Sequence, residues 1–215
     1  MKQPIDLLIY DLDGTLIDSA EDITNAVNHM LGELGLKPRS IEEVRGFIGE
    51  GVQSLVKRSL GGENLAKFDE GLRVVKKYYS EHLLDHTKLY PDVEKVLEHF
   101  RAKKQVVVTN KPEGFSVQVL EGLGVKKYFN RVIGGDSVYT KKPSPEAIFY
   151  ALDQFSVSPD RAVIVGDSLI DIETGHNAKI MTCAVTYGLV GAQMMRTSDA
   201  DFVIDRFADL IKLFS

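Results

Sequence analysis

Small polar and acidic residues follow directly after several short apolar segments of the sequence. Asp11-Leu12-Asp13-Gly14-Thr15 comes after Leu7–Tyr10 in this way. Thr109-Asn110 and Gly166-Asp167-Ser168 each follow a run of valine and isoleucine, and Asp171 lies one helical turn further on. Because the carboxyl ends of parallel strands line one crevice in open α/β sheets, we expect these groups to converge.

The acidic members of this set predict a metal site. Asp11, Asp13, Asp167 and Asp171 cannot all be ionised in one crevice without a cation. Carboxylate oxygens suit Mg²⁺, a hard ion that keeps some of its water and favours substrate phosphate as a further ligand. No His or Cys cluster accompanies these aspartates in the sequence, so zinc is not expected.

The other polar residues predict what the crevice binds. Thr109 and Asn110 offer neutral hydrogen-bond donors, and Lys142 offers a positive charge. Acids with a hard cation, neutral donors and one lysine form a site for a transferring phosphoryl group, where catalysis is mostly positioning and charge neutralisation.

Most of the elements that must position these residues lie in the second half of the chain. From Leu89 onward, short β-branched runs alternate with helical patterns of about 10 to 15 residues, which indicates a parallel sheet covered on both faces. We therefore predict a doubly wound, Rossmann-like α/β core. Its strands are expected over residues 7–10, 106–108, 131–133, 162–165, 181–185 and 202–204.

Residues 18–88 contain no convincing strand and predict an inserted all-helical cap. Ser19-Ala20-Glu21-Asp22 resembles a capping box that opens its first helix. Further helices are expected over 41–45, 52–60 and 64–84. The core is then residues 1–17 and 89–215, with hinges near Asp18 and His86–Tyr90.

Composition bounds the class of protein. A chain of 215 residues is one large domain or one domain with an insertion. A net charge of −5 gives no reason to expect nucleic acid or an anionic membrane as partner. The single cysteine, Cys183, excludes an intramolecular disulfide, and no apolar run suits a targeting or membrane segment. We expect a soluble cytoplasmic protein, as a monomer or homodimer.

Four segments together resemble the haloacid dehalogenase superfamily, and in particular its phosphatases. Asp11-Leu12-Asp13-Gly14-Thr15-Leu16 matches the first motif and Thr109-Asn110 the second. Lys142-Pro143 matches the third, and Gly166-Asp167-Ser168 with Asp171 matches the fourth. The resemblance covers the whole chain and preserves the order of the motifs.

The resemblance implies roles for the acidic residues. Asp11 is expected to attack phosphorus and form an aspartyl-phosphate. Asp13 is expected to protonate the leaving alcohol and then to act as general base on water. Mg²⁺ is expected on the Asp11 carboxylate, the Asp13 backbone carbonyl and Asp167. Family members that cleave carbon–halogen bonds lack the second aspartate, so Asp13 favours phosphate-ester chemistry.

The resemblance also assigns the phosphoryl-binding groups. Thr109, the Asn110 backbone N–H and Lys142 are expected to hold the phosphoryl oxygens. Lys142 is chosen over the adjacent Lys141 because it directly precedes the motif's proline. Asp171 is expected to orient Lys142 or a metal-bound water.

One segment of the cap bears on the substrate. Val44–Val52 resembles the substrate-facing loop of phosphoglycolate phosphatases, in which Gly49 and Gly51 allow a tight turn. The next helix would present free backbone N–H groups to an anion, and Arg45 would add a charged contact. Whether Lys111 contacts substrate is left open.

The predicted function is Mg²⁺-dependent hydrolysis of a small phosphorylated metabolite, with 2-phosphoglycolate as the best candidate. A phosphomutase of the β-phosphoglucomutase kind shares all four motifs, and a non-enzymatic phosphate-binding regulator is the third alternative. One departure concerns local geometry: Ala178-Lys179 stands where relatives usually have Ala-Gly at the end of the fourth motif's helix.

Overall fold

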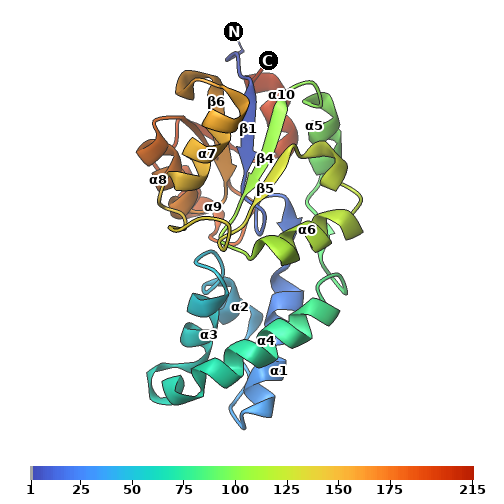
Figure 1. Cartoon of the computed structure of the whole chain (residues 1–215), viewed down its shortest axis with the longest axis vertical. Coiled ribbons are helices and arrows are strands. Elements are labelled where there is room, and N and C mark those ends of the chain that lie inside the picture. Colours follow the sequence, from blue (N-terminus) through green and yellow to red (C-terminus); the bar gives the residue numbers. More distant parts are fainter. Residues whose placement is uncertain (1) are drawn as a thin grey trace.

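Six parallel strands form the central sheet in the computed structural model, which describes residues 2–215 (Figure 1). Their order across the sheet is β5-β4-β1-β6-β7-β8. The chain winds outward from β1 in both directions, so the predicted doubly wound fold is confirmed. The strands are β1 (Leu7–Tyr10), β4 (Lys104–Val108), β5 (Arg131–Ile133), β6 (Ala162–Gly166), β7 (Met181–Val185) and β8 (Phe202–Ile204).

Helices cover both faces of this sheet, which is why its central strands are apolar throughout. In β1, Leu7 and Ile9 pack with α7, whereas Leu8 and Tyr10 pack on the opposite face with α5 and α10. None of the helices in residues 2–215 has both the length and the apolar character needed to cross a membrane. The helices are α5 (Val93–His99), α6 (Glu113–Gly122), α7 (Glu146–Phe155), α8 (Leu169–Ala178), α9 (Ala192–Arg196) and α10 (Leu210–Leu213).

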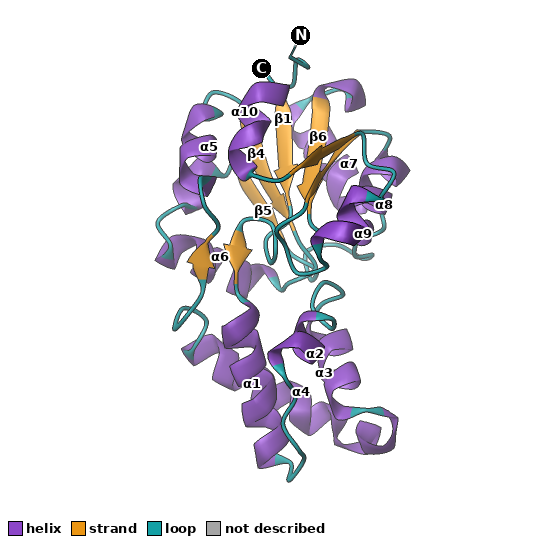
Figure 2. Ribbon diagram, turned by 180° about the vertical axis from the view of Figure 1, so that it is seen from behind, coloured by secondary structure: helices purple, strands orange, loops and turns teal. Residues whose placement is uncertain are grey.

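A separate group of helices lies beyond the carboxyl ends of the strands (Figure 2). The apolar face of α1 packs against α4, α2 and α3, as its periodicity predicts. The single helix predicted over 64–84 is instead a 3₁₀ helix, η1 (Gly62–Lys67), followed by α4. The α-helices are α1 (Ala20–Glu33), α2 (Ile41–Arg45), α3 (Val52–Leu60) and α4 (Phe68–Glu81).

Two short strands at the ends of this helical group differ from the prediction. β2 (Ile17–Asp18) and β3 (Lys88–Leu89) pair antiparallel where residues 18–88 were expected to hold no strand. Strands of two residues show no alternation, so hydrophobic periodicity cannot reveal them. They lie where the sequence predicts hinges.

The predicted capping box at Ser19 is wrong. The Ser19 side chain makes no cap hydrogen bond to α1, and its hydroxyl donates to Asp13 instead. The Asp22 carboxylate accepts hydrogen bonds from the backbone N–H groups of His86 and Thr87, next to β3. Both side chains are used for distant partners, which outweigh the local capping pattern.

The end of α8 keeps the usual geometry without glycine. Lys179 adopts the left-handed conformation, with φ 58° and ψ 37°. The Lys179 N–H donates to the carbonyl of His176, and the Ile180 N–H donates to that of Gly175. The substitution therefore leaves the turn into β7 intact, at a cost of about 1 kcal/mol for a residue with a Cβ atom.

Candidate active site

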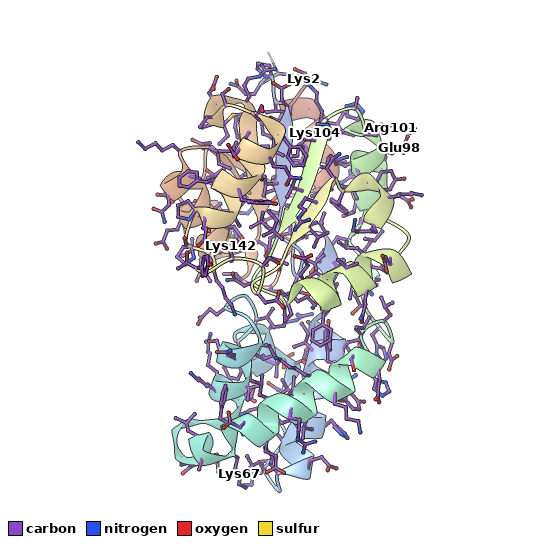
Figure 3. All side chains as sticks on the ribbon, in the orientation of Figure 1. Lys2, Lys67, Glu98, Arg101, Lys104 and Lys142 are labelled. Carbon is purple, nitrogen blue, oxygen red and sulfur yellow. The ribbon has the colours of Figure 1, made fainter. Side chains whose placement is uncertain are left out.

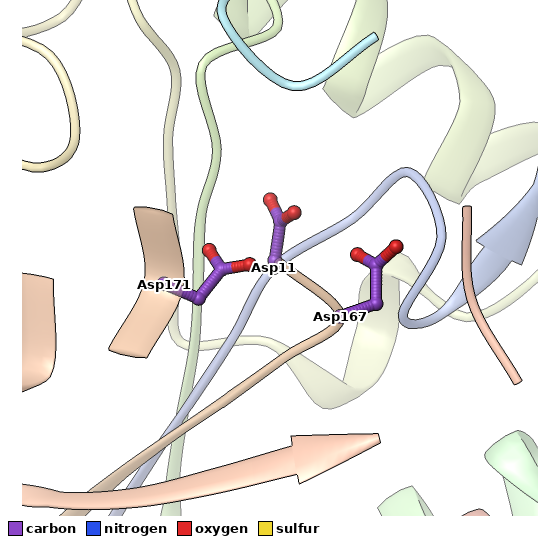
Figure 4. A group of neighbouring side chains, drawn as sticks. All are labelled: Asp11, Asp167 and Asp171. Carbon is purple, nitrogen blue, oxygen red and sulfur yellow. The ribbon is translucent and has the colours of Figure 1, made fainter. Parts of the chain in front are cut away.

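Three buried carboxylates meet at the ends of the adjacent strands β1 and β6. Asp11 follows β1, Asp167 follows β6, and Asp171 lies in the first turn of α8. One oxygen from each lies within 4.8 Å of the others (Figure 4). The strand-end pattern thus brings together residues that are more than 150 positions apart, as predicted.

Lys142 lies in the loop between β5 and α7 (Figure 3). Its Nζ lies 2.8 Å from Asp11 Oδ1 and 2.6 Å from Asp171 Oδ1, and its side chain is 3% exposed. The second oxygen of Asp171 accepts from the N–H and the hydroxyl of Ser168. The structure places Lys142 in the cluster, whereas Lys141 Nζ lies beside Gly51.

The cluster carries more negative charge than its lysine balances. Burial raises the pKa of Asp11 to about 6, although Lys142 lowers it in part. Burial also raises the pKa of Asp167 well above its ordinary value, and the charges of Asp11 and Asp171 raise it further. Oxygen ligands with uncompensated charge fit a hard divalent cation such as Mg²⁺.

Asp167 is held by neutral donors and by close backbone packing. Its Oδ1 accepts from Thr15 Oγ1 at 3.2 Å, and its Oδ2 from the Leu189 N–H at 2.7 Å. A Cβ on Gly14, whose φ is +92°, would come within 2.2 Å of the carboxylate, and one on Gly188 would come within 2.4 Å of it. Any side chain at either glycine would displace Asp167.

The end of β4 contributes Thr109 and Asn110, both nearly fully buried. The Asn110 amide donates to the backbone carbonyl of Gly49 at 2.8 Å and accepts from the Lys142 N–H at 3.0 Å. Asn110 therefore ties the strand end both to the third motif and to the loop before α3, and its side chain is occupied by these contacts.

Asp13 lies outside the acidic cluster and has its own cation. Lys111 Nζ is 2.8 Å from Asp13 Oδ1 and 3.1 Å from Oδ2, and Ser19 Oγ donates to Oδ1 at 2.5 Å. Lys111 also donates to the hydroxyl of Tyr79 in α4 at 2.7 Å. Burial alone would lower the pKa of Lys111, but Asp13 and Tyr79 raise it above its ordinary value.

Most of the residues around Asp13, namely Ser19, Lys111 and Tyr79, were not predicted from the sequence to contact it. The sequence predicts a helix cap at Ser19, and an aromatic residue such as Tyr79 is expected only to pack the helices. Lys111 directly follows Thr109-Asn110, and this adjacency is the one signal for it in the sequence. Nothing in the sequence indicates that Tyr79 reaches it, since the two residues are 32 positions apart.

A cavity of about 70 Å³ is lined by Asp11 of the acidic cluster, by Asp13 with Lys111, and by helices beyond the sheet. That volume holds about five water-sized groups at roughly 10–15 Å³ each. Arg45 is exposed and is not among the lining residues, so its contact with substrate stays a prediction. The polar lining comes from Asp11, Asp13, Tyr79, Thr109, Asn110 and Lys111, and most of the rest is apolar: Ile23, Ala26, Ile48, Val52, Leu55, Val75 and Phe115.

Comparison with known proteins finds relatives along the whole chain. A phosphoglycolate phosphatase of Aquifex aeolicus is 38% identical over 96% of this chain and 95% of its own length. One from Psychrobacter arcticus is 38% identical over 95% of this chain and 94% of its own length. The crystal structure of a predicted phosphoglycolate phosphatase from Haemophilus somnus 129PT has a TM-score of 0.92 and 31% identity, covering 99% of this chain and 98% of that one.

The family model for haloacid dehalogenase-like hydrolases matches residues 8–185. That span begins in β1 and ends with β7, so it contains all four segments on which the resemblance rested. The match confirms the family predicted from those segments. The chain belongs to the haloacid dehalogenase-like hydrolases.

Proposed function

We propose that the protein is a Mg²⁺-dependent phosphatase that hydrolyses a small phosphate monoester through an aspartyl-phosphate on Asp11. One observation carries the proposal: Asp11 is buried at the end of β1, paired with Lys142, and lines a small cavity. A nucleophilic carboxylate beside a fixed cation suits attack on an anionic phosphoryl group. The names of the relatives point to the same reaction class.

The reaction proceeds in two displacements. An oxygen of Asp11 bonds to phosphorus while the ester oxygen leaves with the electron pair of its P–O bond and takes a proton from Asp13. Asp13, now a carboxylate, takes a proton from a water molecule whose oxygen bonds to phosphorus. The bond from phosphorus to Asp11 then breaks, which releases inorganic phosphate and restores the aspartate.

The remaining residues bind charge. Lys142, the Thr109 hydroxyl and the Asn110 N–H contact the phosphoryl oxygens, and Asp171 holds Lys142 in place through its 2.6 Å contact. The Asp11 and Asp167 carboxylates and the Asp13 backbone carbonyl would hold Mg²⁺. When bound, the metal supplies positive charge that neutralises the nucleophile and the phosphoryl group.

The best candidate substrate is 2-phosphoglycolate. The cavity is small, and the relatives named above carry that activity in their names. We also propose that residues 18–88 act as a cap on a core of residues 1–17 and 89–215, with hinges at β2 and β3. The cap shields the site from bulk water, which favours phosphoryl transfer to Asp11 over direct attack by bulk water.

The experiment is release of inorganic phosphate from a panel of phosphorylated metabolites, with Mg²⁺ and with EDTA. We expect turnover that needs Mg²⁺ and is highest with 2-phosphoglycolate. Turnover that survives EDTA, or survives Asp11→Asn, would overturn the mechanism. Equal turnover of all metabolites in the panel would rule out 2-phosphoglycolate as the preferred substrate.

The same panel separates the other functions predicted from the sequence. A rearranged sugar phosphate in place of free phosphate would identify a phosphomutase. Labelling of Asp11 by acetyl phosphate without turnover would identify a phosphate-binding regulator.

A further inference from the structure

Three side chains from separate elements meet at the amino group of Lys111. Lys111 follows β4, Asp13 follows β1 and Tyr79 lies in α4. The side chain of Lys111 is 6% exposed and that of Asp13 is 10% exposed. All three residues line the cavity that Asp11 also lines. The reaction described above uses Asp13 but assigns no task to the other two.

The hydrogen bonds of Lys111 decide how it can act. An ammonium group has three N–H donors. Its partners are Asp13 Oδ1 at 2.8 Å, Asp13 Oδ2 at 3.1 Å and the Tyr79 hydroxyl at 2.7 Å. Each donor therefore has an acceptor within the protein, and a substrate group would have to displace one. The arrangement favours action through Asp13 over direct contact with substrate.

We propose that Lys111 and Tyr79 are positioning residues for Asp13: the Tyr79 hydroxyl orients the ammonium group, which holds the carboxylate in one orientation. The inference rests on the proposed function, in which Asp13 is the general acid and base. General acid catalysis depends on such orientation, because the proton must lie within hydrogen-bond reach of the leaving oxygen.

The position of Tyr79 links this task to the helices beyond the sheet. Its ring packs edge-on against Phe115 of α6, with the ring centres 5.5 Å apart and the planes at 86°. Lys111 Nζ lies 4.7 Å from the centre of the same ring. In this arrangement α4 contacts α6 through the Tyr79–Phe115 pair and brings the Tyr79 hydroxyl to Lys111. Asp13 is fully held when the cavity is covered, which couples proton transfer to exclusion of water.

Two variants and one control test the inference in the full-length enzyme with Mg²⁺. Lys111→Met keeps the length of the side chain and removes its charge, and Tyr79→Phe removes only the hydroxyl. Tyr78→Phe is the matched control, because the neighbouring Tyr78 stacks between His29 and His82.

The readout is kcat/KM with three substrates. 2-Phosphoglycolate and ethyl phosphate release alkoxides that need a proton, but only the first has a carboxylate. p-Nitrophenyl phosphate releases a phenolate that needs none. We expect kcat/KM to fall about 100-fold in Lys111→Met and about 10-fold in Tyr79→Phe with both alkyl esters, and less than about threefold with p-nitrophenyl phosphate. Tyr78→Phe should change none of them.

Each other pattern overturns the inference in a distinct way. A loss confined to 2-phosphoglycolate would make Lys111 a contact for the substrate carboxylate. An equal loss with all three esters would make the two residues structural. If the wild-type enzyme released phosphate from none of the esters, the proposed function itself would fall, and the inference with it.

Discussion

The two walls of the cavity are held in different ways. On the core wall, Asp11, Asp13 and Asn110 lie at the carboxyl ends of β1 and β4. Asp11 is paired with Lys142, Asp13 with Lys111, and Asn110 with backbone groups. On the wall formed by α1, α3 and α4, the lining is almost entirely apolar, and Tyr79 is its polar member.

This difference separates chemistry from shape. The charges that are proposed to react are fixed by a sheet whose strands are buried on both faces, so their geometry follows from the fold. The facing helices contribute the apolar surface of the cavity, which in the proposed function excludes water and limits the size of the substrate. Changes in the core wall should therefore alter rate, and changes among the apolar residues of the helical wall should alter selectivity or leave activity unchanged.

The largest effect is expected on the core wall, at Lys142. Lys142→Met leaves Asp11 and Asp171 buried without their shared cation. We expect phosphate release from 2-phosphoglycolate to fall about 100- to 1,000-fold and the free energy of unfolding to fall by about 3 kcal/mol. Steady-state kinetics and urea unfolding measure the two.

Lys141→Met is the matched control, since Lys141 lies next in the chain but outside the acidic cluster. It should retain phosphate release within about threefold. If the two variants exchanged these effects, the assignment of the third motif to Lys142 would be wrong.

An intermediate effect is expected where the two walls join, at Asp22. Its side chain is 1% exposed and accepts hydrogen bonds from Thr87 and His86. Burial by itself raises the pKa of Asp22, but these hydrogen bonds lower it below the ordinary value. The resulting stability is present above the unfolded-state pKa of about 3.9 and is lost as pH falls through the folded-state pKa.

We therefore expect Asp22→Asn to lower the free energy of unfolding by about 2 kcal/mol at neutral pH. The difference in the free energy of unfolding between this variant and wild type should narrow as the pH falls below about 4. Urea unfolding across this pH range measures this difference. Glu21→Gln is the control, because Glu21 lies on the same helical turn and also contacts His86. A difference that stays constant with pH would contradict a role for the Asp22 charge.

The smallest effect is expected at Arg45 on the helical side. The sequence predicts that it contacts the substrate anion, whereas its side chain is exposed and outside the cavity lining. Arg45→Gln should change KM for 2-phosphoglycolate by less than about twofold, because exposed charges contribute little. A tenfold rise in KM would instead support the contact predicted from the sequence.

The core was predictable because its signals are local. Asp11, Asp167 and Lys142 each sit at a fixed offset from a strand or a proline, and the parallel sheet carries these offsets into one crevice. The doubly wound class of the sheet follows from the same alternation of strands and helices.

The contacts of Ser19, Asp22 and Tyr79 could not be predicted in this way. Their partners lie between 6 and 65 positions away, and each side chain has a plausible local task that the sequence favours. Which task prevails depends on how the helices pack against the sheet, and hydrophobic periodicity does not report that packing.

The covalent state of Asp11 during turnover tests the central claim most directly. The Asp13→Asn variant, given p-nitrophenyl phosphate and Mg²⁺, should form the phospho-enzyme but hydrolyse it slowly, since its general base is missing. After acid quenching and peptide mapping by mass spectrometry, we predict phosphate on the peptide that carries Asp11, and none when Asp11→Asn is added. Phosphate on another residue, or phosphate release by a protein with Asp11→Asn, would contradict the account.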